Sequence, residues 1–172
     1  MAIFGEQESR EESNAALSSQ LPLALMLIFV ILLLLFGNMR DPIVVLVTLP
    51  LIFIGVVLGL GVTGKMFDFF SLLGLLGLIG MNIKNAVILI SRIKELQESG
   101  LAPSEAVATA VEDRFIPVVT ASTTTVLGMT PLLFDSMFGS MAATIMGGLI
   151  VATFMVLVVL PVVYSLFYHI KP

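Results

Sequence analysis

The chain has no cysteine and no tryptophan, and its single histidine, His169, lies near its end. Without cysteine, disulfide frameworks, thiolate nucleophiles and thiolate metal sites are excluded. One histidine likewise excludes histidine clusters. Charged residues are scarce, at 12% of the chain, where ordinary globular proteins have about 25%. The net charge of −4 and the lack of a basic stripe argue against a nucleic-acid partner.

What the chain has instead is apolar: hydrophobic residues make up 58% of its 172 residues. Such a composition disfavours a disordered segment and a soluble enzyme and indicates a membrane protein with lipid as its surroundings. The sequence offers no nucleophile–base pair and no set of metal ligands. We therefore expect neither an enzyme nor a bound cofactor or metal.

Continuous apolar runs separated by short polar breaks predict an all-α membrane protein, a bundle of five transmembrane helices plus a short amphipathic surface helix. An acidic polar tail, residues 1–20, precedes a transmembrane domain of residues 21–170. The spans are expected at about 21–36, 42–62, 69–93, 117–134 and 141–168. The surface helix is expected at about 103–115, where apolar residues form one stripe. A helix packed on the ends of the spans explains that stripe equally well.

Glycine and proline mark the breaks between these spans. Gly37 is suited to end the first helix, Asp41 to cap the second, and Pro42 to occupy its first position. Pro50 lies inside the second span, where we expect a kink. Gly64 is expected in the turn that follows it.

Positive charge predicts the orientation in the membrane. One set of span ends carries Arg40, Arg92, Lys94, Arg114 and Lys171, whereas the other set carries Arg10 and Lys65. Since cytoplasmic loops are enriched in lysine and arginine, the N-terminus is expected outside and the C-terminus in the cytoplasm. Tyr164 and Tyr168, with the basic residues, would anchor a chain that has no tryptophan.

Lys84 is the most informative residue, because it falls near the middle of the third span. A lysine at that depth costs about 2.5–3.5 kcal/mol on insertion scales. At helical spacing it shares one arc with Gly77, Gly80, Ile88 and Ser91, and glycines on such an arc let another helix approach closely. We therefore expect a buried face, with Asn82 and Asn85 accepting hydrogen bonds from the lysine.

None of the twelve acidic residues lies within a predicted span, so the chain offers no mid-membrane partner for Lys84. Either the lysine is uncharged, or a carboxylate from another chain pairs with it. Two interpretations stay open. Lys84 is a static charge that snorkels or plugs the bundle, or its charge or ion partner changes during a transport cycle.

The fourth span contains five hydroxyl residues in a stretch of six: Thr120, Ser122, Thr123, Thr124 and Thr125. They predict either hydroxyls bonded back to the carbonyls of their own helix or a hydroxyl and water path for protons beside Lys84. Arg114 lies at the cytoplasmic mouth of this helix, as a simple positive-inside anchor or as part of that path.

Four stretches, taken together, resemble one transporter family in order and spacing. They are Phe69–Gly80 followed by Ile83-Lys84-Asn85-Ala86-Val87; Leu21–Ala24 with Arg40-Asp41-Pro42 and Leu49-Pro50; Gly100-Leu101 with Glu105-Ala106 and Arg114–Pro117; and Leu127–Leu132 with Met146-Gly147-Gly148 and Pro161-Val162. Over about residues 10–170 the chain resembles the last five spans of resistance-nodulation-division (RND) efflux pumps. More narrowly, it resembles the hydrophobe/amphiphile multidrug exporters of Gram-negative inner membranes.

The resemblance implies a role for each matching residue. Lys84 would be the lysine that pairs with two aspartates in the other half of the pump, and protonation of those aspartates would release it and drive rotation among three subunit states. Asn85 would be its neighbour, and Arg114 the arginine at the cytoplasmic end of the proton path. The family's relay threonine falls on Ala121, so the flanking Thr120 and Ser122, with Thr124, are the candidate relay hydroxyls. Protons would be the coupling ion.

The resemblance also implies what the chain lacks, namely the aspartate pair and the periplasmic domains that bind drug. We therefore expect the transmembrane part of a proton-driven efflux transporter in a bacterial inner membrane, with a carboxylate-bearing membrane half as its partner. Residues 1–20 would then be the stub that leaves the periplasmic domain. The alternative is a small membrane scaffold or regulatory subunit derived from such a pump, which binds other membrane proteins through its glycine face and does not transport by itself. Homo-oligomeric contacts would then accommodate Lys84.

Overall fold

The computed structural model describes residues 2–170, apart from the side chains of residues 2–4, 6 and 10. Lys171, one of the charges used to predict orientation, lies outside the described residues. The helices are α1 (Ala2–Phe36), α2 (Arg40–Thr63), α3 (Phe69–Glu98), α4 (Pro103–Leu133), α5 (Gly139–Phe154), the π-helix η1 (Met155–Val159) and α6 (Leu160–Phe167). No strand occurs within residues 2–170. Five helical segments are long and apolar enough to cross a membrane, which confirms the predicted fold class.

The chain divides after Pro42 into two compact units. In the first, α1 extends through residues 2–20, which the sequence predicted as a polar tail. The helix tolerates this polar stretch because Glu, Gln, Arg and Ala are good helix formers. Ser13, Ser18 and Ser19 also donate their hydroxyls to backbone carbonyls three or four residues earlier, at 2.7–3.0 Å. The segment is therefore polar, as expected, but helical.

The link between α1 and α2 ends and restarts the helix within three residues. Gly37 adopts φ +65°, a conformation that suits glycine, and so confirms the predicted stop. The capping residue, however, is Asn38 and not the predicted Asp41. The Oδ1 atom of Asn38 accepts the backbone N–H groups of Arg40 at 3.1 Å and Asp41 at 3.0 Å. Asp41 in turn accepts the side-chain amide of Asn38 at 3.0 Å, because it already lies within the first turn of α2.

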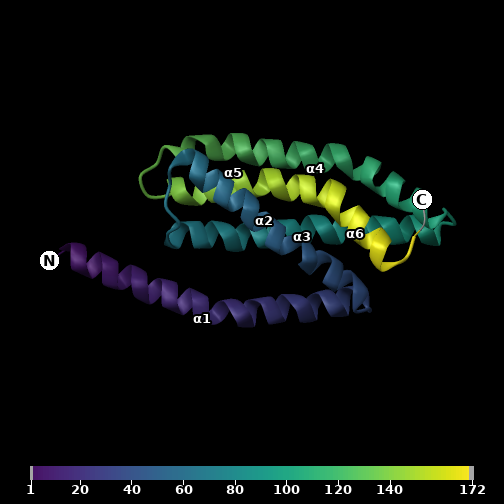
Figure 1. The fold of residues 1–172 in the computed structure, drawn as a ribbon, viewed down its shortest axis with the longest axis horizontal. Helices are drawn as coiled ribbons and strands as arrows, with labels where there is room; N and C mark the ends of the chain where they lie inside the picture. Colours follow the sequence, from purple (N-terminus) through teal and green to yellow (C-terminus); the bar gives the residue numbers. More distant parts are fainter. Residues whose placement is uncertain (1, 171–172) are drawn as a thin grey trace. The chain divides into compact units, whose positions relative to one another are not determined.

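The second unit is a bundle in which α5 contacts both α3 and α4, and α3 contacts α4 (Figure 1). One apolar core joins α2, α3 and α5: it contains Leu49, Ile52, Val56, Leu60, Leu75, Leu78, Ile79, Ala143, Leu149 and Ala152. Short loops connect consecutive helices, with Gly64 at φ +66° in the predicted turn. The outward side chains of these helices include many large apolar residues, as expected for a surface that contacts lipid.

Glycine brings α2 and α5 into backbone contact. A Cβ atom added to Gly59 would lie 2.5 Å from the carbonyl oxygen of Ala143 and 2.9 Å from the Cα of Gly147. A Cβ on Gly55 would lie 2.7 Å from the carbonyl oxygen of Gly147. Any side chain at these positions would push the helices apart. This small-residue crossing is a common way for membrane helices to pack.

The predicted surface helix and fourth span are not separate, since α4 runs without a break from Pro103 to Leu133. Pro117 does not end the helix, because membrane helices tolerate proline where neighbouring groups satisfy the freed carbonyl. The predicted apolar stripe is only partly buried: Ala106 and Ala110 are fully buried, whereas Phe115 is 53% exposed. The first turns of α4 thus pack on the bundle, as the alternative interpretation of the stripe required.

The last membrane segment changes its winding just before Pro161. The backbone N–H of Leu160 bonds to the carbonyl of Met155, five residues earlier, which defines the π-helical turn η1. Pro161 has no backbone N–H and so cannot donate the next helical hydrogen bond. The π-helical turn therefore comes directly before the proline. The segment then continues as α6 and ends at Phe167, close to the predicted end of the fifth span.

Candidate functional site

Lys84 lies near the middle of the 30-residue helix α3, and its side chain is exposed. Within the second unit, the whole arc predicted from the sequence is left uncovered by the other described helices. A Cβ atom at Gly77 or Gly80 would meet nothing within 4 Å, and Ile88 and Ser91 are also exposed. The second unit therefore does not itself form the expected buried face, and its burial against another chain stays a prediction. The remaining side of α3 carries the side chains that the bundle core needs, so the lysine arc is left as its free side.

No hydrogen bond or ion pair joins Lys84 to any residue that the structure describes. The acids on the ends of the helices have other contacts: Asp113 and Glu95 pair with Arg92, and Asp68 accepts the hydroxyl of Ser140. The described residues therefore contain no carboxylate that pairs with Lys84 near the middle of the membrane.

Asn82 and Asn85 do not form the expected pair around the lysine. Asn82 is 1% exposed, and its side-chain amide donates to the hydroxyl of Thr48 on α2 at 3.4 Å. Because residues two positions apart point to nearly opposite sides of a helix, Asn82 faces the core and Lys84 faces away from it. The expectation that Asn82 accepts a hydrogen bond from Lys84 is wrong for this reason. Asn85 is half-buried.

Of the five hydroxyl residues predicted on α4, Ser122, Thr124 and Thr125 form side-chain hydrogen bonds in the described structure. Thr124 donates to the carbonyl of Thr120 at 2.8 Å and Thr125 to that of Ala121 at 2.9 Å, both within the helix. Ser122 is buried and bonds across to Thr153 of α5 at 2.5 Å. Thr120 is exposed. Thr124 and Thr125 therefore bond within their own helix, Ser122 bonds across to α5, and no described hydrogen bond links any of these hydroxyls to Lys84.

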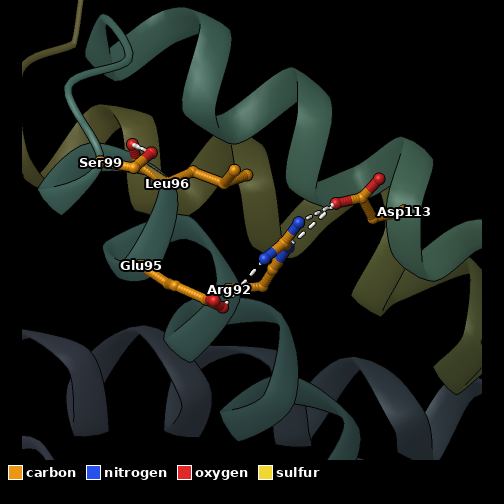
Figure 2. A network of polar contacts seen from close by, with 5 residues as sticks. All are labelled: Arg92, Glu95, Leu96, Ser99 and Asp113. Carbon is orange, nitrogen blue, oxygen red and sulfur yellow. Dashed lines mark hydrogen bonds and ion pairs between the residues drawn. The ribbon is translucent and has the colours of Figure 1, made fainter.

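Arg114 is half-buried, and its Nε atom is buried without a hydrogen-bond partner among the described residues. The neighbouring Asp113 is bound by Arg92 of α3, whose Nε and Nη2 atoms contact the same carboxylate oxygen at 2.9 and 2.7 Å (Figure 2). Arg92 also pairs with Glu95 at 3.0 Å. This network connects the C-terminal end of α3 with the N-terminal part of α4. The sequence did not reveal it, because Arg92 and Asp113 meet only once both helices are placed.

A second polar junction, also missed from the sequence, connects the opposite ends of α3 and α5. Asp68 caps α3 by accepting the backbone N–H of Ser71 at 2.9 Å, and it accepts the hydroxyl of Ser140 at 2.6 Å. An aspartate just before an apolar run is a recognisable capping signal, but its contact with α5 depends on the fold. The two junctions hold α3 in place at both ends, while the arc around Lys84 stays open.

Residues 1–168 match the AcrB/AcrD/AcrF family. The chain is 30% identical over 148 residues to the swarming motility protein SwrC of Bacillus subtilis, covering 83% of this chain and 14% of that protein. It is 29% identical over 171 residues to the cobalt-zinc-cadmium resistance protein CzcA of Cupriavidus metallidurans, covering 96% of this chain and 16% of that protein.

The fold is similar to that of solved transporters. A crystal structure of a heavy metal efflux pump superimposes with a TM-score of 0.81 and 32% identity, covering 94% of this chain and 17% of that pump. The 172 residues therefore span only about a sixth of the length of these relatives. With a family match over nearly all of its length, the chain belongs to the AcrB/AcrD/AcrF family, within the resistance-nodulation-division transporters that its motifs resemble.

Proposed function

We propose that the chain acts as the transmembrane part of a proton-driven efflux transporter, in which Lys84 pairs with carboxylates of a separate membrane half. The observation that supports this most directly is the open arc of α3. A lysine near the middle of a membrane helix follows the uncovered Gly77 and Gly80 on one face, and no acid among the described residues pairs with it. An exposed lysine in that position needs an anionic partner, and glycines let the partner helix come close.

The coupling then follows from the charge on the partner. When the carboxylate is ionised, it attracts the ammonium group of Lys84 and holds the two halves together on this arc. When a proton neutralises the carboxylate, the ion pair is lost and the arc is released. A proton taken up on one side of the membrane and delivered on the other would in this way change how α3 packs. This is secondary transport, in which the chain makes and breaks no covalent bond.

The remaining candidate residues would bring protons to that arc. Asn85 would orient the ammonium group, and Arg114 would hold water at the cytoplasmic end of α4. The exposed Thr120 and the pair of Ser122 with Thr153 would provide hydroxyls along α4. Thr124 would take part only after leaving its bond to the carbonyl of Thr120. We place the chain in a bacterial inner membrane, with its N-terminus periplasmic and its C-terminus cytoplasmic.

The test combines this chain with a membrane half that carries mid-membrane carboxylates. We expect the two to copurify and, in proteoliposomes with an imposed pH gradient, to take up protons. Lys84→Ala should abolish proton uptake and weaken copurification. Lys94→Ala is the matched control, because it removes the same charge from the cytoplasmic part of the same helix. Equal activity of the Lys84→Ala protein and the wild type would overturn the proposal. Stable self-association with no acidic partner would favour the scaffold alternative.

A further inference from the structure

A groove of about 310 Å³ lies between α2 and α5, away from the arc of Lys84. It is lined mainly by apolar side chains and glycine, among them Gly55, Leu58, Gly59, Val62, Gly147 and Ile150, and Leu133 of α4 lines it too. Its volume falls within the range of about 300–1,000 Å³ that is usual for ligand sites.

The glycines that allow α2 and α5 to touch also create this groove. Gly55, Gly59 and Gly147 bring the two backbones together and leave no side chains above the contact. Larger residues then stand at the rim. Leu58 is 57% exposed, Val62 is 87% exposed and Ile150 is 61% exposed, so the groove opens onto the surface that contacts lipid. In a membrane-spanning segment, the molecule that meets such an opening is a lipid acyl chain.

The length of the groove matches one leaflet of a bilayer. From Gly55 to Thr63 it follows α2 for about 12 Å at 1.5 Å per residue. Half of the hydrocarbon core is about 15 Å thick. Because α2 ends at Thr63, the groove runs from the membrane surface to near the midplane. An acyl chain that enters it therefore has its headgroup beside the turn after α2.

Two opposite charges lie at that end. A Cβ on Gly139 would lie 2.7 Å from Nζ of Lys65 and 2.9 Å from the carbonyl oxygen of Leu133, which places the ammonium group beside the Leu133 end of the groove. Asp135 follows two residues after Leu133. The backbone N–H groups of Phe138 and Met137, and more weakly the charge of Lys65, lower the pKa of Asp135. The carboxylate therefore stays ionised at neutral pH.

We propose that this groove binds one acyl chain of a zwitterionic phospholipid with a primary amine, such as phosphatidylethanolamine. Lys65 contacts the lipid phosphate, and Asp135 accepts a hydrogen bond from the lipid ammonium. A cation and a carboxylate at the same end of the groove complement a headgroup that carries both signs, whereas a purely anionic headgroup would be repelled by Asp135. The site is independent of the pairing of Lys84, so either proposal can fail without the other.

The test uses the full 172-residue chain in phosphatidylcholine vesicles that contain a small fraction of phosphatidylethanolamine with a photoreactive acyl chain. Mass spectrometry of the labelled peptides should find the label on the stretches 55–63 and 147–151. Leu58→Trp fills the groove from its exposed rim and should lower the labelling about fivefold, equivalent to about 1 kcal/mol. Val57→Trp is the matched control, because Val57 is exposed at the same depth without lining the groove. This control should keep the labelling.

The headgroup is tested by competition between unlabelled phosphatidylethanolamine and phosphatidylcholine with identical chains. Phosphatidylethanolamine should compete about fivefold better, and Lys65→Gln or Asp135→Asn should remove this difference. Asn at position 135 keeps an oxygen that accepts the N–H groups of Met137 and Phe138, and unfolding curves would verify that each variant is folded. Equal labelling of the two tryptophan variants, or an unchanged lipid preference in both charge variants, would overturn the proposal.

Discussion

Asn82 of α3 and Thr48 of α2 form a buried hydrogen bond of 3.4 Å, and the other polar atom of Asn82, Oδ1, has no partner among the described residues. Helix α3 therefore carries polar groups on two nearly opposite sides. The amide of Asn82 faces the packed core, whereas Lys84, two residues later, faces the open arc. The amide side is fixed within this chain, and the lysine side is available to a partner.

Replacing Asn82 by leucine should stabilise the chain. An unsatisfied buried carbonyl costs about 1–3 kcal/mol, and a hydrogen bond between membrane helices contributes only about 0.6 kcal/mol. Leucine has a similar size and removes both the unsatisfied carbonyl and the hydrogen bond to Thr48. The hydroxyl of Thr48 still donates to the carbonyl of Val45 at 2.6 Å. We expect Asn82→Leu to raise the free energy of unfolding by about 1 kcal/mol, measured by denaturant titration in mixed micelles.

The control for this prediction is Thr48→Val, which removes the partner and leaves the whole amide of Asn82 unsatisfied. It should lower the free energy of unfolding by about 1 kcal/mol. If Asn82→Leu destabilises the chain as much as Thr48→Val does, the carbonyl of Asn82 has a partner in the membrane and its removal is not favourable.

The pairing of Arg92 with Asp113 should be measurable but small. Two guanidinium nitrogens contact one carboxylate oxygen, and both side chains remain partly exposed, at 28% and 40%. Solvent screens pairs of this kind, so their contribution to stability is small. A double-mutant cycle with Arg92→Gln and Asp113→Asn should give a small favourable coupling energy, and the coupling should decrease as salt increases from about 0.05 to 0.5 M.

A cycle between Arg92 and Glu98 is the control, since Glu98 lies on the same end of α3 and forms no salt bridge with the described residues. It should show no coupling. A coupling of Arg92 to Asp113 that does not change with salt would mean that the pair is shielded from solvent, contrary to the described geometry.

The sequence predicted the spans and the direction of Lys84 relative to its glycines because both follow from local patterns. Apolar runs of about 20 residues define membrane helices, and helical spacing alone groups Gly77, Gly80 and Lys84. The structure keeps that arc intact. Whether the arc is covered depends on neighbours, and nothing in the spacing reveals that no described helix of the second unit covers it.

Other features were mispredicted or missed for one of two reasons. Either two local sequence signals competed, or the feature depends on contacts between residues that are far apart in the sequence. Asn38 and Asp41 are both good caps, and only the backbone shows that the helix has already begun at Arg40. Pro117 indicated a helix boundary, but packing of Ala106 and Ala110 on the bundle keeps α4 continuous. The contacts of Arg92 with Asp113 and of Ser140 with Asp68 join residues that are far apart in the sequence, so no local pattern predicts them.

Acidic pH should loosen the turn before α5. Asp135 caps this turn by accepting the N–H groups of Met137 at 2.8 Å and Phe138 at 2.9 Å, and these bonds lower its pKa. A carboxyl whose pKa is lower in the folded state stabilises the fold above its unfolded pKa of about 3.9 and loses that effect as the pH falls through the folded value. We expect the melting temperature to fall below about pH 4, and Asp135→Asn to reduce that fall. A fall of equal size in the variant would assign the effect to other carboxyl groups.

A single methyl group added at Gly59 should disrupt the packing of α2 against α5. The new Cβ would lie 2.5 Å from the carbonyl oxygen of Ala143 and 2.9 Å from the Cα of Gly147, and backbone atoms cannot turn away as a side chain can. We expect Gly59→Ala to lower the free energy of unfolding by about 1–3 kcal/mol, measured in mixed micelles. Gly61→Ala is the matched control on the same helix, because its Cβ would meet nothing within 4 Å. It should leave the stability unchanged or raise it by up to about 1 kcal/mol through helix propensity. Equal effects of the two substitutions would show that α2 does not pack on α5 through glycine, and the groove beside that contact would then lose its structural basis.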